Sequence, residues 1–253
     1  MPFNVPTVDR KEIIKKFKKH ILHTVILRMD FADIFDAKEL ASKMVAKFAK
    51  DFPQRDEETE QLFEQTEFAI VPVNKITSYF LRNNDTHNYI KINKNSIALE
   101  YKTYETFEKL IGVLKDVLAI YSPIYAENRI LRVGLRKINF FDKEEKANLE
   151  IFEGYFNKLL LPSMNNECFD TSLSQDMHSY LIKGEKEEKY SVNFKYGTVK
   201  LEKIRRFILD IDGFSFKELN KDILIKRLEE INNKIFDIFY WSIDDKMKGE
   251  LIQ

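Results

Sequence analysis

Apolar residues up to Pro53 follow two different spacings. Residues 22–31 are rich in β-branched and aliphatic side chains, which is typical of a strand, and a helix is predicted before it at about residues 8–20. After the strand, large apolar residues recur at every fourth position, which predicts one buried helix face: Leu40, Met44 and Phe48. Asp36 and Glu39 have the spacing of a capping box and predict the start of this helix, and Pro53 predicts its end.

Residues 54–126 complete the first half of the chain. The acidic stretch 54–67 has no clear period and is predicted as a solvated connection or a frayed helix. Three short strand candidates follow, at 77–82, 89–93 and 97–101. The last two flank Asn93-Lys94-Asn95, in which asparagine tolerates the left-handed backbone of a tight turn. Helical spacing from Phe107 to Tyr121 predicts a second helix, so this half has the order β-α-β-β-β-α.

Residues 127–253 show a similar succession. Residues 130–141 are enriched in β-branched and aromatic residues and predict a strand. A helix that closes before Pro162 is predicted from four apolar residues: Leu149, Phe152, Phe156 and Leu159. Strand candidates follow at 177–183, 190–196 and 203–211. Spacings of three and four predict a last helix between Leu224 and Phe239.

Two short segments of the first half recur in the second half at nearly equal offsets. Ile26-Leu27-Arg28 returns as Ile130-Leu131-Arg132, and Phe35-Asp36 with Glu39 returns as Phe141-Asp142 with Glu145. These matches predict an α+β fold built by tandem duplication of a β-α-β-β-β-α unit, with antiparallel sheets that carry helices on one face. The predicted units are residues 1–126, which include the N-terminal basic helix, and residues 127–253.

Composition and charge narrow the possible classes of protein. Of the 253 residues, 44% are hydrophobic and 32% are charged, which is typical of a folded chain and excludes intrinsic disorder. Lys and Arg total 41, and Asp and Glu also total 41, so no net field attracts the whole chain to nucleic acid or to a membrane. No apolar leader follows Met1 and no apolar run reaches the length of a membrane span, so we expect a cytoplasmic protein with no membrane partner.

Scarce residue types exclude several chemistries. Cys168 is the only cysteine, which excludes an internal disulfide and any zinc site that needs two thiolates. None of the 7 glycines forms the patterns that bind phosphates in Rossmann or P-loop proteins. The four histidines, His20, His23, His87 and His178, lack the spacing of zinc ligands. His178 could act as a lone acid or base, but a structural role is favoured because the sequence has no nucleophile motif. We therefore expect no cofactor and no catalytic residue.

The segment from Arg132 to Asn139 is the strongest candidate binding surface. Along a strand, Arg132, Gly134 and Arg136 point the same way, so two guanidinium groups flank a residue without a side chain. A planar anion or another backbone could approach closely there. The alternative is that both arginines pair with carboxylates on neighbouring strands, such as Asp210 and Asp212, and that the glycine marks a bulge.

Two further features offer weaker candidates. Asp210 and Asp212 share a strand face and could hold a divalent metal or act as acid and base, although an Asp-x-Asp pair on a strand is more often an ordinary polar face. The first predicted helix carries six cations: Arg10, Lys11, Lys15, Lys16, Lys18 and Lys19. They could contact phosphates or an acidic partner, or they could form a solvated face over an apolar stripe. Phe239-Tyr240-Trp241 is typical of a core, and would anchor an interface if exposed.

Three segments carry a resemblance to a known family. Arg132–Asn139 is similar to an Arg-Ile-Gly-Leu-Arg-Tyr-Ile-Asn motif, with Lys137 in place of the usual tyrosine; the other two segments are Leu209–Asp212 and Ile235–Ile243. The chain thereby resembles, over most of its length, a sporadically distributed prokaryotic family of about 250 residues whose members lack an assigned activity. Patchy distribution implies mobile genes, such as phage-defence or toxin-antitoxin loci, by association only.

These observations favour a non-catalytic cytoplasmic protein that binds a protein partner, within a prokaryotic defence or toxin-antitoxin system. One alternative is a nucleic-acid-binding or nucleolytic protein, in which Arg132, Arg136 and the lysines between residues 11 and 19 contact phosphates. A second alternative is a small-ligand sensor with a pocket between a sheet and its helices.

Overall fold

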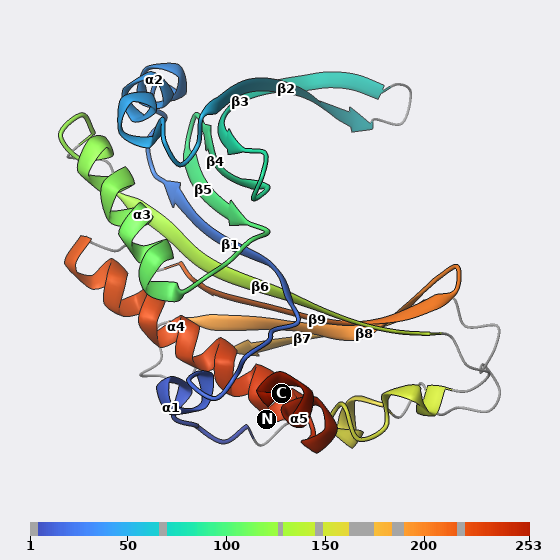
Figure 1. Ribbon diagram of the computed structural model, residues 1–253. Coiled ribbons are helices and arrows are strands. Elements are labelled where there is room, and N and C mark those ends of the chain that lie inside the picture. The colour runs from blue at the N-terminus through green and yellow to red at the C-terminus, as the bar shows by residue number, and fades with distance from the viewer. Residues whose placement is uncertain are drawn as a thin grey trace. The chain divides into compact units, whose positions relative to one another are not determined.

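The computed structural model describes residues 5–65, 70–125, 129–144, 149–161, 175–183, 190–216 and 221–253. The strands are β1 (Leu22–Phe31), β2 (Gln54–Gln65), β3 (Ile70–Asn83), β4 (Asn88–Asn93), β5 (Ser96–Tyr101), β6 (Ile130–Glu144), β7 (Gln175–Lys183), β8 (Ser191–Leu201) and β9 (Ile204–Ser215). They form one nine-stranded antiparallel sheet in the order β2-β3-β4-β5-β1-β6-β9-β8-β7 (Figure 1). The helices are α1 (Arg10–Ile14), α2 (Ala37–Phe48), α3 (Phe107–Tyr121), α4 (Lys221–Ser242) and α5 (Asp245–Ile252).

The predicted α+β fold made of two duplicated β-α-β-β-β-α units is wrong, because the strands belong to a single large antiparallel sheet. Two segments depart from the predicted order. Residues 54–65, predicted as a connection or a frayed helix, form strand β2. The helix predicted from Leu149 to Leu159 is replaced by two short 3-10 turns, Leu149–Phe152 and Lys158–Leu160.

Contacts between distant residues explain both departures. On β3, the Arg82 guanidinium lies 2.5 Å from a Glu58 carboxylate oxygen and 3.5 Å from one of Asp56, so the acidic β2 gains a cation on its neighbouring strand. In the second segment, the ring of Phe156 stacks on that of Phe207 at a centroid distance of 3.8 Å. Phe152 also contacts Phe207, so aromatic contacts with β9 stabilise residues 149–161 in the observed conformation.

The chain divides into two compact units that are each discontinuous in sequence. Unit 1 comprises residues 1–24, 135–215 and 226–253, and unit 2 comprises residues 25–134 and 216–225. The boundary that the sequence suggested, between residues 126 and 127, stays a prediction.

In unit 2, helix α2 packs on α3 and on strands β3 and β4 (Figure 1). The predicted strand at 22–31 is confirmed as β1, and alternate residues along it are buried: Val25, Leu27, Met29 and Phe31. The predicted capping box is confirmed on its Asp36 side, because the Asp36 carboxylate accepts a 2.9 Å hydrogen bond from the Glu39 amide. The turn after β4 is held by the Asn93 side chain, which accepts from the amides of Asn95 and Ser96, rather than by a left-handed asparagine.

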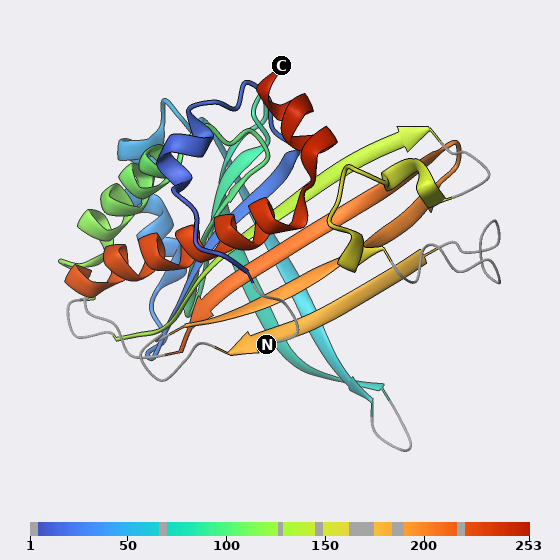
Figure 2. The same cartoon turned by 90° about the horizontal axis from the view of Figure 1, so that it is seen from below.

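In unit 1, the C-terminal helices lie over one face of the strands (Figure 2). The predicted alternation on β9 holds except at Asp210. Phe207, Leu209 and Ile211 are buried and Ile208 and Asp212 are half-buried, but Asp210, which was expected on the polar face, is buried as well. Helix α4 presents a buried stripe at the predicted spacing: Leu228, Ile231, Ile235 and Ile238.

The N-terminal helix is shorter than the predicted range of residues 8–20. Helix α1 ends at Ile14, and the amides of Lys18 and Lys19 donate instead to the carbonyl oxygen of Leu251 on α5, at 2.7 and 3.2 Å. The Phe17 ring lies against that of Phe236, with centroids 6.5 Å apart. Docking onto the C-terminal helices therefore replaces intrahelical hydrogen bonds in this segment.

The buried Asp237 on α4 predicts a pH dependence of stability. Burial raises the pKa of its carboxyl, although the Val8 amide donates a 3.0 Å hydrogen bond to it. The folded state therefore binds this proton more tightly than the unfolded state, so the contribution to stability is full below the ordinary Asp pKa of about 4 and falls as pH rises through the raised value.

Replacement of Asp237 by asparagine removes this titration and keeps an oxygen that can accept from Val8. The stability of Asp237→Asn relative to the wild type is expected to increase between about pH 4 and the raised pKa and to become constant above it. Urea unfolding at a series of pH values measures both curves. Curves that run parallel across this range would contradict the expectation.

Candidate functional site

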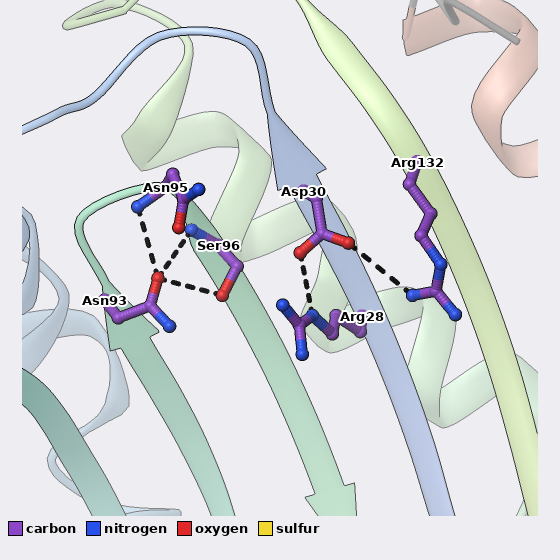
Figure 3. A network of polar contacts seen from close by, with 6 residues as sticks. All are labelled: Arg28, Asp30, Asn93, Asn95, Ser96 and Arg132. Carbon is purple, nitrogen blue, oxygen red and sulfur yellow. Dashed lines mark hydrogen bonds and ion pairs between the residues drawn. The ribbon is translucent and has the colours of Figure 1, made fainter. Parts of the chain in front are cut away.

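Two arginines converge on one carboxylate on the face of β1 and β6 that is opposite to the buried residues of β1. Figure 3 shows Arg28, Asp30 and Arg132 together. The Arg28 Nε lies 2.7 Å from Asp30 Oδ1, and the Arg132 Nη1 lies 3.6 Å from Asp30 Oδ2. All three side chains are partly exposed. Exposed guanidinium groups donate charge-assisted hydrogen bonds to carboxylates and other anions.

Gly134 gives the Arg132 guanidinium the room to lie along its own strand. A Cβ atom at position 134 would come within 3.1 Å of Nη2 and 3.2 Å of Nη1 of Arg132. The Arg132 Cζ also lies 5.9 Å from the centre of the Phe216 ring, which is 70% exposed. We call the five residues of unit 2 the Arg132 cluster: Arg28, Asp30, Arg132, Gly134 and Phe216.

Arg136 makes a separate ion pair in unit 1. Its Nε and Nη2 donate to the two carboxylate oxygens of Asp210 at 2.7 and 2.6 Å, which is the bidentate geometry of a strong charge-assisted pair. Asp210 lies on β9 and its side chain is only 10% exposed. The predicted alternative, in which the arginines pair with carboxylates on neighbouring strands, is confirmed for Arg136 with Asp210; for Arg132 the partner is Asp30, which the sequence did not single out.

Asn139 is not on the same strand face as the arginines. Its side chain is buried and donates a 3.2 Å hydrogen bond to the Leu209 carbonyl oxygen, so it holds β6 to β9. Lys137, which replaces the tyrosine of the similar motif, donates a 2.7 Å hydrogen bond to the fully buried Asn232 of α4. Strand alternation sends these odd-numbered side chains toward the helices and the even-numbered arginines away from them.

The structure brings no third metal ligand to Asp210 and Asp212, the weaker metal-binding candidate, among the residues that it describes. Within them, no group of three or more His, Cys, Asp and Glu side chains could hold a metal ion. Asp210 is instead engaged by Arg136. Cys168 lies outside the described residues.

An Asp-His pair on β7 escaped the sequence reasoning. The His178 Nε2 lies 3.1 Å from a carboxylate oxygen of Asp176, and the His178 ring stacks on that of Tyr196 at 5.0 Å. Burial and a hydrogen bond with Tyr180 raise the pKa of the Tyr196 hydroxyl. The i, i+2 spacing of Asp176 and His178 on a strand was the signal that could have indicated this pair.

Five lysines of the N-terminal segment are exposed: Lys11, Lys15, Lys16, Lys18 and Lys19. Exposure is needed both for a solvated face and for a surface that contacts phosphates. Only Lys11 among these lies within α1, so they do not form one face of a long helix. Lys15 is 2.6 Å from a carboxylate oxygen of Glu12. Of the predicted aromatic cluster, Phe239 and Tyr240 lie half-buried next to the Phe236 ring.

Comparisons with known proteins add no family to this description. No family model matches the chain, and no curated protein matches it. In the described part of the chain, none of the helices has the length and apolar character that crossing a membrane requires.

Proposed function

We propose that this protein is a non-catalytic binding module, and that its Arg132 cluster holds a protein partner. The observation that carries the proposal is that the Arg132 guanidinium lies near both the Asp30 carboxylate and the exposed Phe216 ring. Arginine and aromatic side chains are enriched among the residues that dominate binding energy at interfaces. The fitting partner presents a carboxylate next to an apolar side chain.

Ion pairing on the sheet favours a protein partner over nucleic acid. Arg28 and Arg132 share Asp30, and Arg136 is held by Asp210. A phosphate chain that approached these arginines would also meet their carboxylates, which repel it. A protein surface carries both signs of charge and can complement both groups. The exposed lysines between residues 11 and 19 are the feature that supports the nucleic-acid alternative.

The setting of this function is also part of the proposal. The resemblance of Arg132–Asn139 to the motif of a patchily distributed prokaryotic family suggests a partner within a defence or toxin-antitoxin system. A cytoplasmic location agrees with the single cysteine, since such a chain builds no disulfide framework of its own.

Arg132→Ala is expected to weaken partner binding about tenfold or more, because it removes a guanidinium that Gly134 and Asp30 hold in place. Gly134→Ala is expected to weaken it less, since the new methyl group displaces the guanidinium by a few tenths of an ångström without removing it. The partner is captured from the source organism with the wild-type chain and purified, and titration calorimetry measures its affinity for each variant.

Arg206→Ala is the matched control, because Arg206 is also ion-paired, to Asp142, but lies outside the Arg132 cluster. Equal affinity of the wild type and Arg132→Ala for the partner would overturn the proposal. So would a chain that captures no protein but binds RNA or DNA with an affinity that falls steeply with salt, because that result supports phosphate contacts instead.

A further inference from the structure

The two edges of the sheet differ in how well they resist pairing with another strand. The edge strand β2 carries Arg55 and five acidic residues: Asp56, Glu57, Glu58, Glu60 and Glu64. Two copies of such a strand repel each other, which is a common protection of sheet edges. The opposite edge strand β7 has one acidic and one basic residue, Asp176 and Lys183, and its centre has neither. Of the two edge strands, only β7 has a charge pattern that allows two copies of the strand to pair.

The outer face of β7 also exposes apolar side chains. Leu181 is 58% exposed and Met177 is 39% exposed, and both belong to the odd-numbered, exposed set of this strand. Among the described residues, the strand pairs with β8 and has no strand on its other side. An edge strand whose centre has no acidic or basic residue and which exposes apolar side chains is a template for a further strand.

The sequence of β7 is complementary to itself in an antiparallel arrangement. The strand runs from residue 175 to residue 183, so only the register centred on Ser179 pairs all of its residues with a second copy. In this register Met177 lies opposite Leu181 of the second copy, and this contact occurs twice. His178 lies opposite Tyr180, and Gln175 lies opposite Lys183. No two like charges face each other.

We propose that β7 pairs with β7 of a second copy of this chain, antiparallel and centred on Ser179, to form a two-fold symmetric dimer. Backbone N–H and C=O groups at the edge are satisfied by the second strand, and the Met177 and Leu181 side chains cover each other. Residues directly opposite in an antiparallel pair share one face, so each exposed apolar side chain meets its counterpart. This surface lies in unit 1 and is separate from the Arg132 cluster in unit 2.

Sedimentation velocity of the full chain, from about 1 to about 100 µM, measures this equilibrium. The wild type is expected to shift from monomer to dimer within the range. Leu181→Lys is expected to raise the dissociation constant at least about tenfold, because symmetry introduces the lysine twice. Leu201→Lys is the matched control: Leu201 is an exposed leucine at the end of β8, and its substitution is expected to leave the equilibrium unchanged. Near-ultraviolet circular dichroism confirms that each variant is folded.

A second substitution tests the register itself. Met177→Glu combined with Leu181→Lys places opposite charges across the two-fold axis, so the double variant is expected to recover dimerisation that Leu181→Lys loses. A wild-type chain that stays monomeric at about 100 µM overturns the proposal, and so does a dimer that Leu181→Lys does not weaken. Lack of recovery in the double variant overturns the register centred on Ser179.

Discussion

Gly197→Ala is expected to destabilise the protein by on the order of 3 kcal/mol, as a backbone clash in a well-packed sheet does. Gly197 on β8 faces Met177 on β7 in the strand register. A Cβ atom at position 197 would lie 1.9 Å from the Asp176 carbonyl oxygen and 2.8 Å from the Met177 Cα, and the φ of 157° is one that residues with side chains rarely adopt. No rotamer change relieves contact with backbone, so β7 must move away.

Urea unfolding measures this destabilisation, and hydrogen exchange is expected to show faster exchange of the β7 amides. Gly134→Ala is the matched control, because the atoms nearest to its new Cβ belong to the flexible end of Arg132, at 3.1 to 3.3 Å. Its stability is expected to stay within about 0.5 kcal/mol of the wild type. Equal stability of Gly197→Ala and the wild type would show that β7 approaches β8 less closely than the structure indicates.

Arg136→Ala is expected to destabilise the protein by about 2 kcal/mol, because it leaves the Asp210 carboxylate without its bidentate partner. The Asp210 side chain is 10% exposed, so water replaces the lost hydrogen bonds poorly. Thermal and urea unfolding measure the loss. A double-mutant cycle with Asp210→Asn isolates the coupling between the two side chains.

Arg206→Ala provides the comparison with equal geometry and different burial. Arg206 also binds a carboxylate with two hydrogen bonds, at 2.7 and 2.8 Å, but its partner Asp142 is 39% exposed. Its loss is expected to cost less than about 1 kcal/mol. If instead Arg136→Ala changed stability by less than about 0.5 kcal/mol and weakened partner binding, Arg136 would belong to the binding surface. Unchanged stability together with unchanged binding would contradict both roles.

Local patterns were sufficient to predict several parts of this protein. Enrichment in β-branched and aliphatic residues indicated β1. Alternation indicated much of β9, and helical spacing indicated α2 and α3, because there the period of the apolar residues matches one element. The Asp36 cap also needed only neighbouring residues. The Arg136–Asp210 pair was one of two predicted alternatives, since both side chains were expected on neighbouring strands.

The tertiary structure alone decided which distant residues supply partners. Residues 54–65 form a strand by pairing with β3 along their length, where Arg82 lies beside the Glu58 carboxylate. Residues 149–161 form two 3-10 turns rather than a regular helix, with Phe156 stacked on Phe207. For the Arg132 cluster, strand alternation shows that Arg28 and Asp30 share a face, but only strand order brings β1 beside β6. Sequence patterns describe which face of an element is buried. Which element lies next to that face depends on contacts between residues far apart in the chain, and these decided the sheet and its candidate site.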